Sequence, residues 1–364
     1  MLTESRDYRP DYDVPPGRLL DEYLNELGIS AREFARRCGR SAKLIVEIIA
    51  GKAPIEPETA MQFERVLGMG ADVWLAMEAN YRLRLAEIED EKRLAEQAPW
   101  ARRFPLAELR RRGAIGSAGS GADDARQLLA FFGVGSIEAC RQRFDDVAAV
   151  SFRHSPSFDS NEEALVAWLR LGELAAENIE CGDYDRARFL DALREARALT
   201  LKPLADALPS LTTACARAGV AFVVIKALPD IALSGISRWL SPRKGMIQQS
   251  LRHLANDHFW FTFFHEAAHL LLHSRKTVFL DGNGHGGSGP EEEEANRWAA
   301  NFLIPQAALQ RFIASFDGTE AEVVAFAEEE GVAPGIVVGQ LQNAGVLTFA
   351  QMNRLKERYK WTAA

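Results

Sequence analysis

The chain has 364 residues, a mass of 40.3 kDa and a formal net charge of −8, from 43 basic and 51 acidic side chains. Hydrophobic residues make up 47% and charged residues 26%, which excludes a mostly disordered or collagen-like chain. This length predicts two or three domains. The acidic balance excludes a protein that coats nucleic acid over its whole surface, so any nucleic-acid contact must be a local patch.

The sequence also predicts a compartment. No apolar run approaches the roughly 18 residues that a membrane span needs, and the polar residues 1–13 do not form a signal peptide. The four cysteines lie far apart without a CxxC pair, which indicates buried thiols in a reducing compartment. They are Cys38, Cys140, Cys181 and Cys215. We therefore expect a cytoplasmic protein with no membrane partner.

Three stretches of different character predict a multidomain, mainly α protein. Residues 1–95 form short helices separated by turns, with a longer helix from Ala71, and predict an all-α domain. Residues 96–217 predict a helical linker or middle domain, in which the Gly-, Ala- and Ser-rich residues 113–123 form a flexible loop. Residues 218–364 predict an α+β domain.

The α+β domain should begin with short β-branched strands and continue with helices. The expected strands are residues 220–228, 236–240 and 246–251. The expected helices are residues 257–273 and 290–303, separated by a Gly-rich loop at 281–289, with further helices over much of 306–360.

A helix-turn-helix pattern occupies residues 31–50. Gly39 is expected to make the turn, and a recognition helix should start at Ser41 and direct its first residues toward base edges. The residues expected to pack inside are Phe34, Ala35, Cys38, Ile45 and Ile48.

Basic residues cluster around this pattern. Between Arg32 and Lys52 there are six basic and two acidic side chains, a local charge of +4 that suits phosphates. The residues expected to contact DNA are Arg40, Ser41, Lys43, Glu47 and Lys52. However, Leu44 and Val46 are apolar where the helix should face DNA, so this face is alternatively a protein-binding surface. A small helical domain with a solvated basic face is a further alternative.

Residues 15–80 resemble the HigA-type antitoxins of the XRE repressor class. The resemblance rests on Pro16-Gly17-Arg18, on residues 51–55 (GKAPI) and on Trp74. It implies a dimeric transcription regulator that binds an operator and represses its own operon, often within a toxin-antitoxin system. A DNA operator, a toxin partner and a homodimer are therefore expected partners.

The second motif, His265-Glu266-Ala267-Ala268-His269, is an HExxH sequence. On a helix, residues i and i+4 lie on one face, so both imidazoles can bind one Zn²⁺ at about 2.0–2.1 Å. Glu266 is then positioned to take a proton from a zinc-bound water. The alternative is a helix with surface histidines. The aromatic and leucine-rich flanks favour a buried helix, in which such polar groups need partners.

A third zinc ligand is expected in the next helix, within Glu291-Glu292-Glu293-Glu294. Glu294 stands one turn before Trp298 and is the favoured ligand, with Glu291 second. His285 in the Gly-rich loop remains an alternative. His273 is about 12 Å from His265 along a helix axis, which is too far for a shared metal.

The stretches Phe259–His273 and Glu293–Pro305 resemble the ImmA/IrrE metallopeptidases. The resemblance implies a zincin-like α+β domain with one zinc held by His265, His269 and Glu294, and Glu266 as the catalytic base. Known substrates of that family are helix-turn-helix repressors. We therefore expect a hydrolase: a zinc metalloendopeptidase fused to a DNA-binding transcription regulator, cleaving a repressor or another regulatory protein.

The alternative function is a HigA-like antitoxin or repressor whose protease-like domain is a sensor or partner platform with little turnover. Two further hypotheses concern the expected peptidase activity. Residues 246–251 would be a sheet edge that binds substrate as an added strand, which Gln248→Pro should weaken. The 113–123 segment would be either a site of self-cleavage or only a linker.

Overall fold

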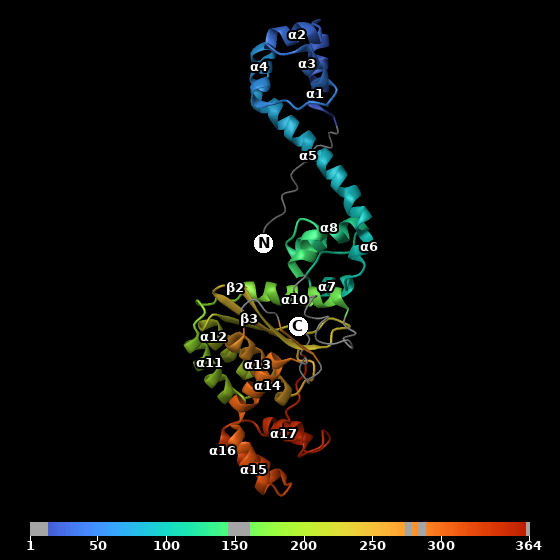
Figure 1. Cartoon of the computed structure of the whole chain (residues 1–364). Helices are drawn as coiled ribbons and strands as arrows, with labels where there is room; N and C mark the ends of the chain where they lie inside the picture. The colour runs from blue at the N-terminus through green and yellow to red at the C-terminus, as the bar shows by residue number, and fades with distance from the viewer. Residues whose placement is uncertain (1–13, 145–160, 274–278, 283–288, 362–364) are drawn as a thin grey trace. The chain divides into compact units, whose positions relative to one another are not determined.

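The computed structural model describes residues 14–144, 161–273, 279–282 and 289–361 (Figure 1). The chain divides into two compact units, Met1–Pro99 with Gly119–Ala125, and Trp100–Ala118 with Arg126–Ala364. The described part of the chain contains no helix that is both long enough and apolar enough to cross a membrane. The predicted domain boundaries after residues 95 and 217 stay predictions.

The first unit is helical. Its main elements are α1 (Pro16–Glu26), α2 (Ala31–Cys38), α3 (Ala42–Ile49), α4 (Pro57–Leu67) and α5 (Ala71–Glu96). The five apolar residues predicted to pack inside the helix-turn-helix are all buried, which confirms that prediction. The Phe63 ring completes this core, 5.0 Å from the Phe34 ring and 5.5 Å from the Trp74 ring.

Local chemistry fixes the bounds of the two central helices. The Ser30 hydroxyl accepts from the Glu33 N–H at 3.2 Å, and the Ser41 hydroxyl accepts from the Leu44 N–H at 3.1 Å. Such N-caps satisfy backbone donors that have no partner inside the helix. Gly39 ends α2 with φ 66°, a left-handed conformation that glycine adopts without strain.

The second unit holds the remaining elements. Two helices, residues 98–101 and 121–132, include residues of both units. The helices before the sheet are α6 (Ala98–Ala101), α7 (Leu106–Arg111), α8 (Gly121–Phe132), α10 (Glu162–Glu177), α11 (Arg186–Leu199) and α12 (Leu204–Arg217). The strands are β1 (Val220–Val224), β2 (Leu233–Ser241), β3 (Lys244–Gln249) and β4 (Phe279–Gly282). The helices of the last third are α13 (Asn256–Leu272), α14 (Pro290–Leu303), α15 (Gln306–Ser315), α16 (Glu320–Glu330), α17 (Pro334–Asn343) and a short 3₁₀ turn, η1 (Asn353–Leu355). The mainly α, multidomain fold class is confirmed.

One local prediction needs correction, and one strand has no counterpart among the predicted elements. Residues 121–123, expected in a flexible loop, open α8, because Ser120 and Asp123 cap its start reciprocally through their side chains and backbone N–H groups. The strand β4 was not predicted at all. It has only four residues and ends in Asp-Gly, a typical turn signal, so its pairing with β2 decides its conformation.

The sheet has the strand order β1-β3-β2-β4. Figure 1 labels its two inner strands, β2 and β3. β3 pairs in parallel with β1 and antiparallel with β2, and β2 pairs antiparallel with β4. β3 is therefore an interior strand, and the prediction that residues 246–251 form a substrate-binding edge is wrong. Residues 246–250 are buried, with side chains that alternate between the two helix-covered faces of the sheet.

Helices cover both faces of this sheet. On one face, the Gln248 side chain donates to the Trp168 carbonyl of α10 at 2.8 Å, and Arg238 donates to the Leu169 carbonyl at 3.1 Å. On the other face, Phe222 of β1 packs its ring 5.2 Å from Phe263 of α13. α13 thus lies between the sheet and the C-terminal helices, within a continuous core that runs from α11 to Tyr359.

The cysteines are free thiols. Cys38, Cys140 and Cys215 are buried and Cys181 is half-buried. Burial raises the pKa of the Cys38 and Cys140 thiols to about 11, so these two are poor nucleophiles at neutral pH.

Candidate metal centre and helix-turn-helix surface

The HExxH motif lies in the middle of α13, the most enclosed helix of the second unit. The aromatic residues of this helix pack in the core of the second unit. Because the helix is enclosed, the polar residues of the motif are buried as well. His265, Glu266 and His269 are 1%, 0% and 3% exposed. The surface-histidine alternative therefore does not describe this helix.

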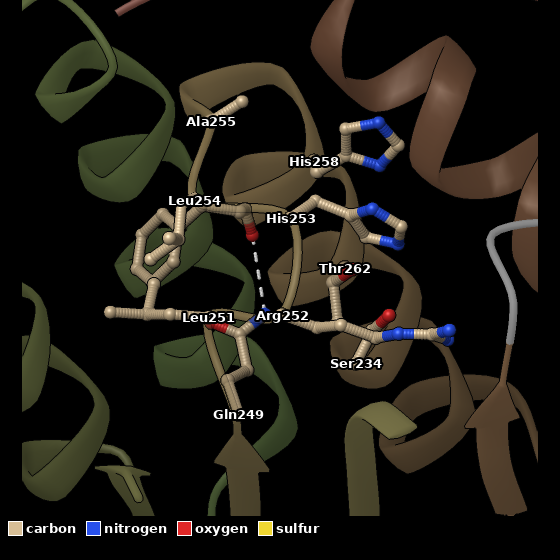
Figure 2. A pocket seen from close by; sticks show the side chains of 10 residues that line it. Ser234, Gln249, Leu251, Arg252, His253, Leu254, Ala255, His258 and Thr262 are labelled. Atoms are coloured by element: carbon tan, nitrogen blue, oxygen red, sulfur yellow. Dashed lines mark hydrogen bonds between the residues drawn. The ribbon is translucent and has the colours of Figure 1, made fainter. Parts of the chain in front are cut away.

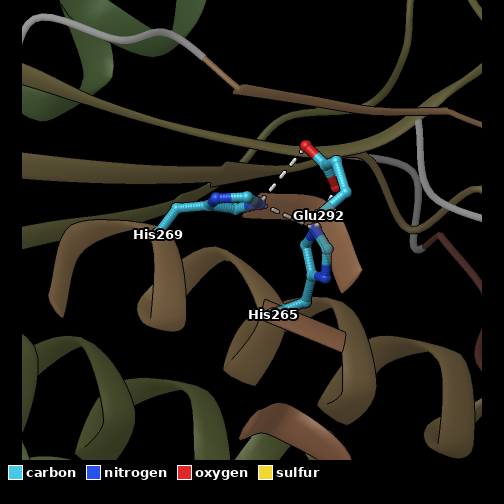
Figure 3. A group of neighbouring side chains, drawn as sticks. All are labelled: His265, His269 and Glu292. Carbon is cyan, nitrogen blue, oxygen red and sulfur yellow. Dashed lines mark hydrogen bonds and ion pairs between the residues drawn. The ribbon is translucent and has the colours of Figure 1, made fainter. Parts of the chain in front are cut away.

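Glu292 of α14 supplies the carboxylate that faces these histidines (Figure 3). Glu294 is not part of this group. Glu292 is 3% exposed and shares a helix face with the buried Ala295 and Ala299. Glu294 points elsewhere, with a side chain 55% exposed. Because four glutamates follow one another, the sequence does not show which of them lies on the buried face of the helix. The signal that could have identified Glu292 is its i, i+3, i+7 spacing to the two alanines.

The other predicted alternatives for the third ligand can also be placed. Glu291 is exposed at the start of α14. His285 lies outside the described residues. Within the described part of the chain, His265, His269 and Glu292 form the group of side chains whose ligand atoms lie close enough for one metal ion, all within 4.8 Å of one another.

The donor atoms have the spacing of a metal site. The two histidine Nε2 atoms are 3.0 Å apart, His265 Nε2 lies 3.2 Å from Glu292 Oε2, and His269 Nε2 lies 3.5 Å from Glu292 Oε1. A tetrahedron with bonds of about 2.0–2.1 Å has edges of about 3.3 Å. Two imidazoles and one buried carboxylate therefore fit a tetrahedral ion and leave its fourth position open.

Protonation states suit metal binding as well. Burial lowers the pKa of His269 to about 4, so its imidazole is neutral at neutral pH. Burial alone would raise the pKa of Glu292, but hydrogen bonds and charge from His265 and His269 outweigh it and lower this pKa to about 2. Neutral imidazoles and an ionised carboxylate are the forms that bind a metal ion.

Glu266 packs against the sheet, and Gly235 of β2 makes room for it. A Cβ atom on Gly235 would lie 2.7 Å from Thr262 Cγ2 and 3.0 Å from both Cγ and Oε1 of Glu266. The pairing of β2 with β4 also shifts register between Leu233 and Gly235. A glycine in a strand often marks such a bulge or a close approach, and here it is both.

Arg40, one of the residues expected to contact DNA, also binds side chains of α4. The Arg40 guanidinium donates to Gln62 of α4 at 2.6 Å and pairs with Glu58 at 3.0 Å, so its side chain is only 23% exposed. Lys43 is exposed and lies 3.7 Å from Glu47. Ser41, Lys52 and Val46 are exposed, Val46 by 55%.

Comparisons with known proteins agree with both motifs. The IrrE N-terminal-like domain of the Peptidase M78 family matches residues 247–340. The N-terminal region matches the uncharacterized HTH-type transcriptional regulator YddM of Escherichia coli, 35% identical over 72 residues, which cover 20% of this chain and 77% of that protein. It also matches virulence-associated protein I of Dichelobacter nodosus, 36% identical over 79 residues, 21% of this chain and 73% of that protein.

The chain therefore belongs to the HTH-type transcriptional regulators and carries a Peptidase M78 domain. The solved structure of the antitoxin GraA matches 21% of this chain and 84% of its own length, at 26% identity and a TM-score of 0.21.

A groove of about 1130 Å³ lies in the M78 domain between α13, α14 and α17. Phe261 and Thr262 line it about one turn before His265, and the rings of Phe261 and His265 are 6.2 Å apart. Glu294 also lines the groove, whereas the buried His265, His269 and Glu292 do not. Carboxamide side chains are frequent along its wall. They include Asn296, Asn301, Gln306, Gln340 and Asn343.

A smaller pocket, with space for about one water molecule, adjoins the start of α13 (Figure 2). His253 and His258 line both this pocket and the groove, and their rings stack 4.2 Å apart. The turn that presents His253 holds Leu251 and Leu254 at φ 57° and 49°, conformations that cost a leucine roughly 1–2 kcal/mol each. Packing of both leucines against the core offsets this strain.

Proposed function

We propose that the chain is a zinc-dependent endopeptidase fused to a DNA-binding transcription regulator. The observation that carries the proposal is the buried set of His265, His269 and Glu292 beside the HExxH glutamate, in a domain of a peptidase family. Three protein ligands with an open fourth position are typical of catalytic zinc, whereas structural zinc sites have four.

A bound zinc ion supplies Lewis acidity, which acidifies a water molecule and polarises a peptide carbonyl. The residues of the chain supply the remaining steps. Glu266 takes the proton of the attacking water at its carboxylate and delivers it to the nitrogen of the leaving amine. Gly235 leaves the space in which this side chain sits.

The groove, whose wall includes Phe261 and Thr262 about one turn before His265, suits an extended peptide. Carboxamide side chains can both donate to and accept from a peptide backbone, whatever its sequence. Phe261, Trp298 and Phe349 add apolar contact area along the same groove. We therefore place the substrate there, with its scissile bond near His265.

The helix-turn-helix unit is the DNA-binding part of the proposal. The second helix of such a motif enters the major groove, and the exposed lysines at 43 and 52 are available for phosphates. Ala42 and Val46 expose apolar surface on α3, which suits the methyl group of thymine. A regulatory protein bound at the same promoter, such as a repressor, is the favoured substrate, because tethering raises its effective concentration.

In the alternative function, the chain is a transcription regulator whose M78 domain has little or no peptidase activity. The similarity to an HTH-type transcriptional regulator favours a regulator. In this alternative the chain binds an operator as a homodimer, and its M78 domain senses a signal or binds a partner such as a toxin. Catalysis by Glu266 separates the two functions, because a sensor domain has no use for a general base beside an open metal position.

A proteome-derived peptide library tests the proposal without a known substrate. The zinc-loaded protein should generate new peptide termini that mass spectrometry detects, and Glu266→Gln should generate none while binding the same amount of zinc. Identical termini in both samples, or none with the zinc-loaded wild type, would favour the regulator without turnover.

A further inference from the structure

Glu294, although absent from the metal centre, is linked to it through His273. His269 Nδ1 lies 2.8 Å from His273 Nδ1, and His273 Nε2 lies 3.3 Å from Glu294 Oε2. His273 follows the last residue of α13, one helical turn after His269, and its side chain is 4% exposed. The contacts form one line from the surface carboxylate to the metal-facing imidazole.

This line allows a single placement of protons when a metal is bound. His269 presents Nε2 to His265 and Glu292, so Nε2 must carry the lone pair for the metal and Nδ1 must carry the proton. That Nδ1–H donates to His273 Nδ1, which must then be an acceptor. The His273 proton is therefore on Nε2, from which it donates to the Glu294 carboxylate.

We propose that His273 and Glu294 are positioning residues that hold His269 in its metal-binding tautomer and orientation. The inference rests on the proposed metal site at His265, His269 and Glu292. Metal-ligating histidines commonly donate their second ring N–H to an acceptor, and loss of that acceptor costs about 10–100-fold in metal affinity. Neither residue binds the metal itself.

Zinc affinity, measured by competition with a chromophoric chelator on the full chain, tests the proposal through graded variants. His273→Leu removes the acceptor and should weaken zinc binding by about 10–100-fold. His273→Asn keeps an acceptor close to the position of Nδ1 but loses the donor to Glu294. It should therefore behave like Glu294→Ala, for which we expect a loss of about tenfold because the carboxylate is half exposed.

The matched control is Glu293→Ala, which removes an exposed glutamate next to Glu294 on the same helix. It deletes the same charge without touching His273 and should change zinc affinity by less than about twofold. Equal affinities for Glu294→Ala and Glu293→Ala, together with wild-type affinity for His273→Leu, would overturn the proposal.

Nuclear magnetic resonance gives a readout that needs no variant. Two-bond ¹H–¹⁵N correlations of the metal-loaded wild type should show His269 protonated at Nδ1 and His273 protonated at Nε2, and the opposite tautomer at His273 would overturn the proposal. Failure of the metal site itself gives a different result. The wild type would then bind no zinc, which would overturn the proposed function together with this inference.

Discussion

The helix-turn-helix unit and the M78 domain both place their proposed functional side chains on helices, but at opposite depths. Lys43 and Val46 of α3 are exposed above a small apolar core, whereas His265 and Glu266 of α13 are themselves part of the interior. In the first unit, the proposed DNA binding and the folding therefore depend on different residues. In the M78 domain the residues proposed for catalysis are also part of the interior, so substitutions there should affect stability and activity together.

The largest effect that tests this separation is expected from Phe34→Ala. Phe34 is fully buried against Phe63, and truncating such a phenylalanine costs about 3–5 kcal/mol. The first unit should melt at a lower temperature and lose DNA binding, while the zinc content of the chain stays unchanged. Calorimetry measures the melting temperature, and metal analysis of the same sample measures the zinc content. A parallel loss of zinc would show that the two functions are not separable.

Gly235→Ala tests the opposite expectation for the M78 domain. The added methyl group meets Thr262 and Glu266 at 2.7–3.0 Å, and overpacking of this kind costs about 1–3 kcal/mol. Urea unfolding should show the loss, and Thr262→Ser, which removes Cγ2, should recover part of it in the double variant. Full stability of Gly235→Ala would mean that Glu266 has more room than the structure shows.

A surface substitution in the first unit should change binding alone. Lys43→Ala should leave the free energy of unfolding within about 0.5 kcal/mol of wild type. If Lys43 neutralises a phosphate, the slope of log affinity against log salt falls by about 1. Lys92→Ala, an exposed lysine of α5, is the control and should leave the slope unchanged. The same slope in both variants would remove Lys43 from the DNA-binding surface.

A modest effect is expected in the pH dependence of stability. Burial lowers the pKa of His253 to about 4, below the ordinary value of 6.5, so between these pH values the unfolded chain binds the extra proton. Stability should therefore fall as the pH drops from 6.5 to 4. His253→Gln should reduce the stability lost between pH 6.5 and pH 4 by roughly 1 kcal/mol, a figure lowered because the residue is only about half buried. An unchanged slope would contradict the shift.

Much of the helix-turn-helix could be predicted from the sequence, because its signals are local. Ser30 and Ser41 cap helices, Gly39 permits a left-handed turn, and Phe34 recurs at helical spacing with other core residues. The exception is Arg40, whose guanidinium binds Gln62 and Glu58 of another helix. A contact between helices leaves no local pattern.

The candidate metal centre shows the same limit. His265 and His269 share a helix, so their spacing alone places them together. Glu292 comes from a different helix. Whether its side chain faces the histidines depends on which face of α14 packs against α13. The sequence EEEE carries no information about that rotation. For the same reason, residues 246–251 were predicted as a sheet edge, although long-range pairing makes β3 an interior strand.

Metal content tests the central claim most directly. Purified wild-type protein should contain about one zinc ion per chain, and Glu292→Ala should contain none. Glu294→Ala should still bind one at saturating zinc, with reduced affinity. Zinc retained by a folded Glu292→Ala, or lost completely from Glu294→Ala alone, would contradict the site of His265, His269 and Glu292.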